Sequence, residues 1–165
     1  MQTLRRMARH NAWENARVFD TCAAIAPEQL SEEARGTYGS VGDTLAHLAE
    51  VEDIYLLMLR GDDVGQVTND DSYMTHDTAW FANRSRELSD GYRETLESNN
   101  EAWLGETFVV PWFGFPITRR DGLLQVWMHS AQHRAQVLSA LGSHGIEVPD
   151  VDYIYMLSLE QETQD

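Results

Sequence analysis

The sequence predicts an all-α protein, specifically a four-helix bundle with long connections. Three observations support this fold class. Apolar residues recur at three- and four-residue spacing in four long segments. Capping and stop signals mark the ends of those segments. The chain has 165 residues, enough for one well-filled core, so we expect a single domain over residues 1–165.

Each predicted helix follows from its own local signals. In the first, apolar residues repeat at helical spacing until a proline stops the pattern. The second and fourth open with segments that resemble a capping box, in which Asp replaces the usual Glu: Ser40-Val41-Gly42-Asp43 and Thr118-Arg119-Arg120-Asp121. Glycines follow the last periodic residues of these two helices. The predicted ranges are Gln2–Ala26, Ser40–Arg60, Asp77–Asn99 and Thr118–Leu141.

The connections between these helices are long for a bundle, where roughly 2–8 residues usually suffice. The segment 61–76 is long enough to carry the chain back along the bundle, which would place the second and third helices parallel. Before the last helix, Thr107–Val110 and Phe115–Ile117 flank Gly114, and we expect a short hairpin or an extended flap there.

The surface is expected to be strongly acidic. The chain has 27 Asp and Glu residues against 12 basic residues, and every basic residue is Arg because the sequence contains no Lys. The formal net charge of −15 argues against nucleic acid or an anionic membrane as a partner, since both need local positive potential. A high-salt cytoplasm and GC-rich coding bias both explain this composition, and the sequence does not separate them.

Segments that would target or anchor the chain are not expected. The stretch Met1–Arg9 lacks the apolar core of a signal peptide. No stretch approaches about 18 uninterrupted apolar residues, the length that a membrane span requires. The single cysteine, Cys22, falls on an apolar stripe and is expected to be a buried small side chain. We therefore expect a soluble, cytoplasmic protein.

Three histidines carry the strongest functional signal. His129 and His133 are four residues apart in the fourth helix, so they share one helix face. His47 lies on an apolar stripe of the second helix. Two ligands from one helix and one from another would form a three-histidine site, and three protein ligands leave one coordination position open, as in catalytic metal sites.

A more ordinary role competes with the metal site. A single buried imidazole is more often a hydrogen-bonded core residue than a ligand, and spacing alone leaves both roles open. Three neutral imidazoles buried in one small bundle each need a hydrogen-bond donor and an acceptor as partners. A shared metal ion would bind one nitrogen of each ring and so reduce the number of hydrogen-bond partners required. Asp43, Glu50 and Gln136 are candidates to orient the rings. The remaining histidines are expected at the surface or at helix ends: His10, His76 and His144.

Four segments resemble the DinB-like (DinB/YfiT) family of small metal-binding four-helix bundles. His10–Asn15 is similar to the aromatic-Asn-x-Trp-x-Asn opening of the family, with His10 in place of the aromatic residue. Gly39–Leu48 is similar to its Ser-Ile-x-x-Thr-Leu-x-His stretch. His129–Val137 is similar to its His-x-x-His-His-Arg-Gly-Gln-Val block, and Asp152–Tyr155 matches a recurring tail element.

This resemblance spans most of the chain in order. It places the family's metal ligands on His47, His129 and His133. Two positions depart from the pattern, since Gln132 replaces one histidine of the double-His and Ala135 replaces the glycine, and neither is a ligand position. The resemblance implies an up-down-down-up bundle, often a homodimer, that binds a divalent metal such as zinc or nickel. Related members are thiol S-transferases or isomerases that use bacillithiol or mycothiol.

These observations lead to a preferred function and two alternatives. The preferred one is a metal-dependent enzyme that transfers a low-molecular-weight thiol to an electrophile, because coordination to a metal deprotonates a thiol. Metal-dependent hydrolysis and a metal-stabilised binding or stress-response module without turnover remain open. The partners expected are a small thiol or electrophile and a second copy of the chain. The candidate pocket residues are Asn11, Trp13, Trp112 and Gln136.

Overall fold

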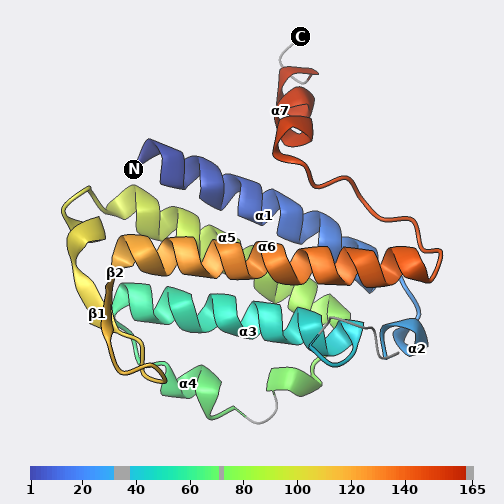
Figure 1. Ribbon diagram of the computed structural model, residues 1–165, viewed down its shortest axis with the longest axis horizontal. Helices are drawn as coiled ribbons and strands as arrows, with labels where there is room; N and C mark the ends of the chain where they lie inside the picture. Colours follow the sequence, from blue (N-terminus) through green and yellow to red (C-terminus); the bar gives the residue numbers. More distant parts are fainter. Residues whose placement is uncertain (32–37, 71–72, 163–165) are drawn as a thin grey trace.

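The computed structural model describes residues 1–31, 38–70 and 73–162, and it is mostly helical (Figure 1). Four long helices form the bundle: α1 (Gln2–Ala23), α3 (Val41–Arg60), α5 (Thr78–Ser98) and α6 (Arg119–Ser143). Shorter elements lie in the connections and at the end of the chain: α2 (Pro27–Leu30), α4 (Gly65–Thr68), the 3₁₀ helices η1 (Tyr73–Thr75) and η2 (Trp103–Gly105), and α7 (Tyr153–Glu162). The predicted all-α fold class is confirmed.

The bundle has the predicted up-down-down-up topology. Helix α1 packs against α5 and α6, and α3 packs against the same two helices. Two contacts give the relative direction of α3 and α5. Asp53 of α3 pairs with Arg84 of α5, and seven residues later in each helix Arg60 donates to the carbonyl of Gly91. Because the contacts advance in the same direction along both chains, the two helices run parallel. In Figure 1 the described parts of the connection, 61–70 and 73–77, lie along the bundle beside α3, which makes this arrangement possible.

Local signals explain where the helices begin and end. Ser40 and Thr118 each form a complete capping box, with Asp43 and Asp121 respectively, as the sequence predicts. Gly61 ends α3 in the left-handed conformation with φ 82°, which glycine adopts without strain. The first helix ends at Ala23 rather than Ala26, because Pro27 opens the separate helix α2 at its first turn.

The predicted hairpin before the last long helix is present. Strands β1 (Thr107–Val109) and β2 (Pro116–Thr118) pair antiparallel, with Phe108 opposite Ile117. The ring of Phe108 packs over Gly122 of α6: a Cβ atom added at Gly122 would lie 2.7 Å from Phe108 Cζ. This close approach attaches the hairpin to the start of α6.

Helix α7 is not among the four predicted helices. After the segment 144–152 has run back along the bundle, α7 projects away from its side, next to α1 (Figure 1). Its contacts are made with α1, where Tyr155 lies edge-on to the Trp13 ring and Arg9 pairs with Glu160. A ten-residue helix is marginal on its own, so these tertiary contacts stabilise it.

The core of the bundle is built mainly from aliphatic and aromatic side chains of the four long helices. Cys22 is fully buried there, and burial raises the pKa of its thiol to about 12, which confirms its expected role as an apolar core residue. In the described residues, no helix combines the length and apolar character needed to cross a membrane.

Candidate metal centre

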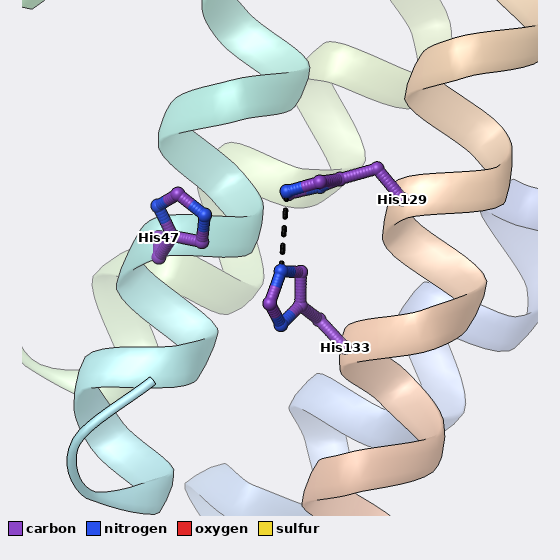
Figure 2. A group of neighbouring side chains, drawn as sticks. All are labelled: His47, His129 and His133. Carbon is purple, nitrogen blue, oxygen red and sulfur yellow. Dashed lines mark hydrogen bonds between the residues drawn. The ribbon is translucent and has the colours of Figure 1, made fainter. Parts of the chain in front are cut away.

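Three imidazole rings converge between α3 and α6. His47 comes from the first half of α3, and His129 and His133 come from successive turns of α6. Figure 2 shows the rings facing one another across the gap between these antiparallel helices. One nitrogen atom from each ring lies within 4.8 Å of one from each of the others. The structure therefore brings together the three histidines that the sequence singled out.

The distance between two of the rings fits a shared ion. Nε2 of His129 lies 3.1 Å from Nε2 of His133. Two nitrogens bound to one tetrahedral zinc ion at about 2.0–2.1 Å are separated by about 3.3 Å. His47 completes the group, with its ring centroid 5.1 Å from that of His129 and 5.0 Å from that of His133.

Gln136 sets the orientation of the His133 ring. Its Oε1 atom lies 2.7 Å from His133 Nδ1. An amide oxygen can only accept, so His133 Nδ1 carries the proton and donates it to Gln136. The lone pair of His133 therefore lies on Nε2, the atom that faces the other rings. This is the orienting role expected for a group hydrogen-bonded to a metal-binding histidine.

His129 is short of hydrogen-bond partners. Its Nδ1 atom is buried and has no partner among the described residues. Burial, followed by the neighbouring His133 and His47 rings, lowers the pKa of His129 from 6.5 to about 4. Burial also lowers the pKa of His133. Both rings are therefore neutral at pH 7, which is the form that binds metals.

Two contacts fix the ring of His47. Tyr38 stacks on it, with ring centroids 4.1 Å apart and planes 10° apart. Glu50, one turn further along α3, places Oε2 at 3.7 Å from His47 Nδ1. The carboxylate thus lies near Nδ1. Three imidazoles with converging nitrogens are a donor set that suits zinc, nickel, copper or iron, so these residues fit a divalent ion.

The cluster lacks a fourth protein ligand in the part of the chain that the structure describes. The group that could hold a metal consists of the three histidines, and no cysteine or carboxylate of the described residues lies within 4.8 Å of all three. A three-ligand donor set of this kind leaves a position for an external molecule, whereas structural zinc sites are closed by four protein ligands.

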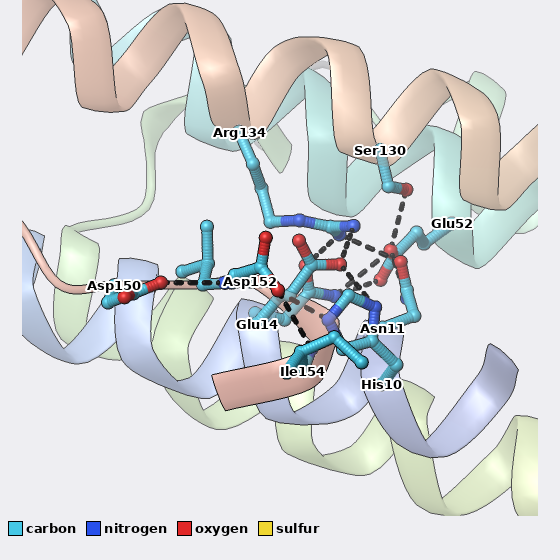
Figure 3. A network of polar contacts seen from close by, with 11 residues as sticks. His10, Asn11, Glu14, Glu52, Ser130, Arg134, Asp150, Asp152 and Ile154 are labelled. Carbon is cyan, nitrogen blue, oxygen red and sulfur yellow. Dashed lines mark hydrogen bonds and ion pairs between the residues drawn. The ribbon is translucent and has the colours of Figure 1, made fainter. Parts of the chain in front are cut away.

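Figure 3 shows a buried polar network that includes Ser130, the residue next to His129 in α6. At its centre is Glu52 of α3, a residue that is 1% exposed. Ser130 of α6, which lies between His129 and His133 in the sequence, donates its hydroxyl to Glu52 at 2.7 Å. The network therefore ties the two helices that carry the histidines to each other.

The same network extends to α1 through Asn11 and Asn15. Both side-chain amides donate to Glu52 at 2.9–3.0 Å. Their oxygens accept from Arg134 at 2.7 and 2.6 Å, and Arg134 also pairs with Glu14 at 2.6 Å. Arg134 is 2% exposed, so its charge is compensated almost entirely by these neighbours.

The four candidate pocket residues lie in separate environments. Gln136 contacts the histidine cluster, as described. Asn11 belongs to the buried network. Trp13 lies on the α7 side of α1, stacked on His10 at 5.9 Å. Trp112 is 51% exposed in the loop of the hairpin, with its ring 6.3 Å from that of Tyr55. A substrate-binding role for these four residues stays a prediction.

Tyr38, which stacks on His47, was not among the candidate residues. Tyr38 lies in a connection with no helical period, so no local signal pointed to it. Asp43, considered as a partner for a ring, instead completes the capping box of Ser40. His10, expected at the surface or a helix end, is half-buried and contacts Glu14 and the Val151 carbonyl. His144 does end a helix, because it is the C-cap of α6.

The fold and the cluster define a class of protein: an up-down-down-up four-helix bundle with three histidines converging between two of its helices. The chain belongs to the DinB family, whose model matches residues 1–164. The comparison with curated proteins gives no match.

Solved structures of Bacillus proteins share the fold. YfiT from Bacillus subtilis, described as a probable metal-dependent hydrolase with an unusual four-helix bundle topology, has 19% sequence identity and a TM-score of 0.69 over 89% of this chain and 90% of that chain. A DinB-like protein from Bacillus cereus has 19% identity and a TM-score of 0.66 over 85% and 91% of the two chains. The DinB-like protein YjoA from Bacillus subtilis has 13% identity and a TM-score of 0.67 over 88% and 97%.

Proposed function

We propose that the protein is a metal-dependent enzyme that transfers a low-molecular-weight thiol to an electrophilic acceptor. The observation that carries this proposal is the donor set of three converging histidines without a fourth protein ligand among the described residues. A divalent ion such as zinc or nickel, held by His47, His129 and His133, would lower the pKa of a thiol in the remaining position.

The protein's own residues hold the ligands in place. Gln136 keeps the lone pair of His133 on the atom that faces the cluster. Tyr38 holds the plane of the His47 ring, and the hydrogen bond from Ser130 to Glu52 fixes α6 against α3. In the reaction, the thiol gives its proton to solvent, its sulfur forms a bond to the electrophilic carbon, and the leaving group departs with its bonding electrons.

The carboxylates near the cluster support a thiol over water as the nucleophile. Hydrolysis would use a general base within hydrogen-bond reach of the attacking water. Among the described residues, the carboxylate in contact with the rings is Glu50, and it lies near Nδ1 of His47. A thiol bound to a metal ion is deprotonated without such a base.

Metal-dependent hydrolysis is the second candidate. It is favoured by the description of YfiT as a probable metal-dependent hydrolase, a protein of the same fold. A module without turnover is less well supported, because a donor set of three leaves a position for an exchangeable ligand.

The test is an assay of the metal-loaded protein against a panel of thiols with an electrophilic acceptor such as monobromobimane, with conjugates measured by mass spectrometry. We expect metal-dependent conjugation that is lost in His47→Ala and retained in His144→Ala, which removes a histidine outside the cluster. The same preparations are assayed with ester and amide substrates. Turnover of these without conjugation would favour hydrolysis, and turnover of neither would overturn the enzymatic proposal.

A further inference from the structure

Glu50 is the carboxylate of α3 that reaches the histidine cluster. It lies one turn after His47, and its Oε2 atom is 3.7 Å from His47 Nδ1. Figure 2 shows one nitrogen of His47 turned toward the other two rings and the second turned away from them. Because Glu50 lies at Nδ1, Nε2 is the nitrogen that faces His129 and His133. The carboxylate is therefore behind His47, and it is not part of the group that could hold an ion.

Glu50 differs from the other two acidic residues that follow His47 on this helix. Glu52 accepts four hydrogen bonds within the buried network. Asp53 pairs with Arg84. Within residues 1–31, 38–70 and 73–162, Glu50 forms no ion pair with an arginine and no hydrogen bond, and its ion-pair partner is His47. Half-buried and without a cation, this carboxylate has a functional rather than a stabilising environment.

Metal binding would give the contact between Glu50 and His47 a defined chemistry. An imidazole that binds an ion through Nε2 carries its proton on Nδ1. That N–H would then face a carboxylate, and such charge-assisted hydrogen bonds are about 2.7–2.9 Å long. Rotation of the Glu50 side chain has to shorten the present distance by only about 0.8–1.0 Å. Tyr38 stacks on the face of the His47 ring, so it does not compete for the nitrogen at the edge.

The same arrangement is already formed at a second ring of the cluster. His133 Nδ1 donates to Gln136 Oε1 at 2.7 Å, and Gln136 also lies three residues after its histidine. His47 and Glu50 repeat this spacing on α3. The two acceptors differ in charge, because glutamine is neutral whereas Glu50 is an anion. Imidazole ligands bring no charge to a divalent ion, so a carboxylate behind one of them also offsets part of the charge of the ion.

We propose that Glu50 is a positioning residue of the metal site. It accepts the Nδ1 proton of metal-bound His47 and so directs Nε2 of that ring at the ion. The inference rests on the metal binding that the proposed function requires. It deepens that function, because it assigns the carboxylate in contact with the rings to the orientation of a ligand and not to proton transfer from a nucleophile.

The test is zinc affinity, measured by chelator competition with protein stripped of metal. Glu50→Leu removes the acceptor and should weaken zinc binding about 10–100-fold. Glu50→Gln keeps an acceptor oxygen without the charge, so its loss should be smaller, and this partial rescue separates orientation from charge. Glu147→Leu and Glu147→Gln, at an exposed glutamate after α6, are the matched controls and should bind zinc like the native protein. A change of less than about threefold in Glu50→Leu would overturn the proposal.

Two further measurements separate positioning from a general effect on the fold. The guanidinium midpoint of the metal-free protein should be the same in Glu50→Leu as in the native chain, because the partner that Glu50 loses is His47 alone. Long-range proton–nitrogen NMR spectra of the zinc-bound native protein should show His47 bound through Nε2, with its proton on Nδ1. Zinc bound through Nδ1 of His47 would overturn the proposal.

Turnover distinguishes a positioning residue from a general base. Activity lost in Glu50→Gln should recover as the zinc concentration is raised, because the defect is in metal binding. A loss that zinc does not restore, with zinc affinity unchanged, would identify Glu50 as a general base and overturn the proposal. Zinc binding by the native protein with equal affinity in Glu50→Leu overturns this inference alone, whereas no zinc binding by the native protein overturns the proposed function with it.

Discussion

Replacement of Glu52 by Gln tests whether the buried network stabilises the bundle. Glutamine keeps the size of the side chain but replaces one carboxylate oxygen with an amide that can only donate. In the native structure both oxygens of Glu52 accept from Asn15, and one also accepts from Asn11 and Ser130. The NH₂ group of the new glutamine would therefore face the NH₂ group of Asn15, and neither could accept a hydrogen bond from the other.

The expected loss can be worked out from these contacts. Asn15 cannot turn its amide round without breaking the 2.6 Å hydrogen bond that its oxygen accepts from Arg134. A buried donor left without an acceptor costs about 1–3 kcal/mol, and hydrogen bonds to a charged group exceed neutral ones by about 1 kcal/mol each. With partial relaxation, we expect Glu52→Gln to lower the free energy of unfolding by about 3–4 kcal/mol.

The assay is guanidinium unfolding followed by circular dichroism at pH 7, with a chelator present. Glu94→Gln is the matched control, because that glutamate is on the surface of α5, and its change should stay within about 0.5 kcal/mol. A loss below about 1 kcal/mol for Glu52→Gln would show that the network contributes little and would refute this reasoning.

Three further predictions concern the cluster and the hairpin. Because the pKa of His129 is lowered in the folded protein, the unfolded chain binds a proton between pH 6.5 and about 4 that the folded chain does not. The free energy of unfolding of the metal-free protein should therefore fall as the pH drops through this range. A His129→Gln variant should show a shallower fall, and parallel curves for the two proteins would contradict the assignment. Gln136→Leu removes the acceptor for His133 Nδ1 and should weaken zinc binding about 10–100-fold in a chelator competition; a change of less than about threefold would exclude the orienting role. Gly122→Ala places a Cβ atom against Phe108 and should lower the free energy of unfolding by about 1–3 kcal/mol. Gly142→Ala is the control, because its Cβ atom meets no atom within 4 Å. In the same guanidinium unfolding assay the control should be neutral or stabilising.

The long helices could be predicted because their signals are local. The capping boxes at Ser40 and Thr118 and the glycine after Arg60 act within a few residues, and the structure uses all of them. Helix α7 could not be predicted in the same way. Tyr153, Ile154 and Tyr155 follow one another without an apolar stripe, and the helix is stabilised by α1, which is distant in sequence.

The cluster itself could be predicted from spacing and family motifs, whereas its surroundings could not. His129 and His133 share a helix face for geometric reasons, and the motif around His47 supplied the third ring. Tyr38 reaches His47 through the path of a connection, which has no periodicity to read. Glu52 did leave a signal, since it interrupts the inward stripe that includes Leu48 and Leu56, and a charge in such a position indicates a buried polar network.

Metal binding to the three histidines is the central claim, and it can be measured directly. Protein made without an affinity tag is stripped with a chelator and titrated with zinc and with nickel. We expect one ion per chain, with binding abolished in His47→Ala and His133→Ala and unchanged in His144→Ala. Unchanged metal content in the first two variants, or no binding by the native protein, would contradict the account.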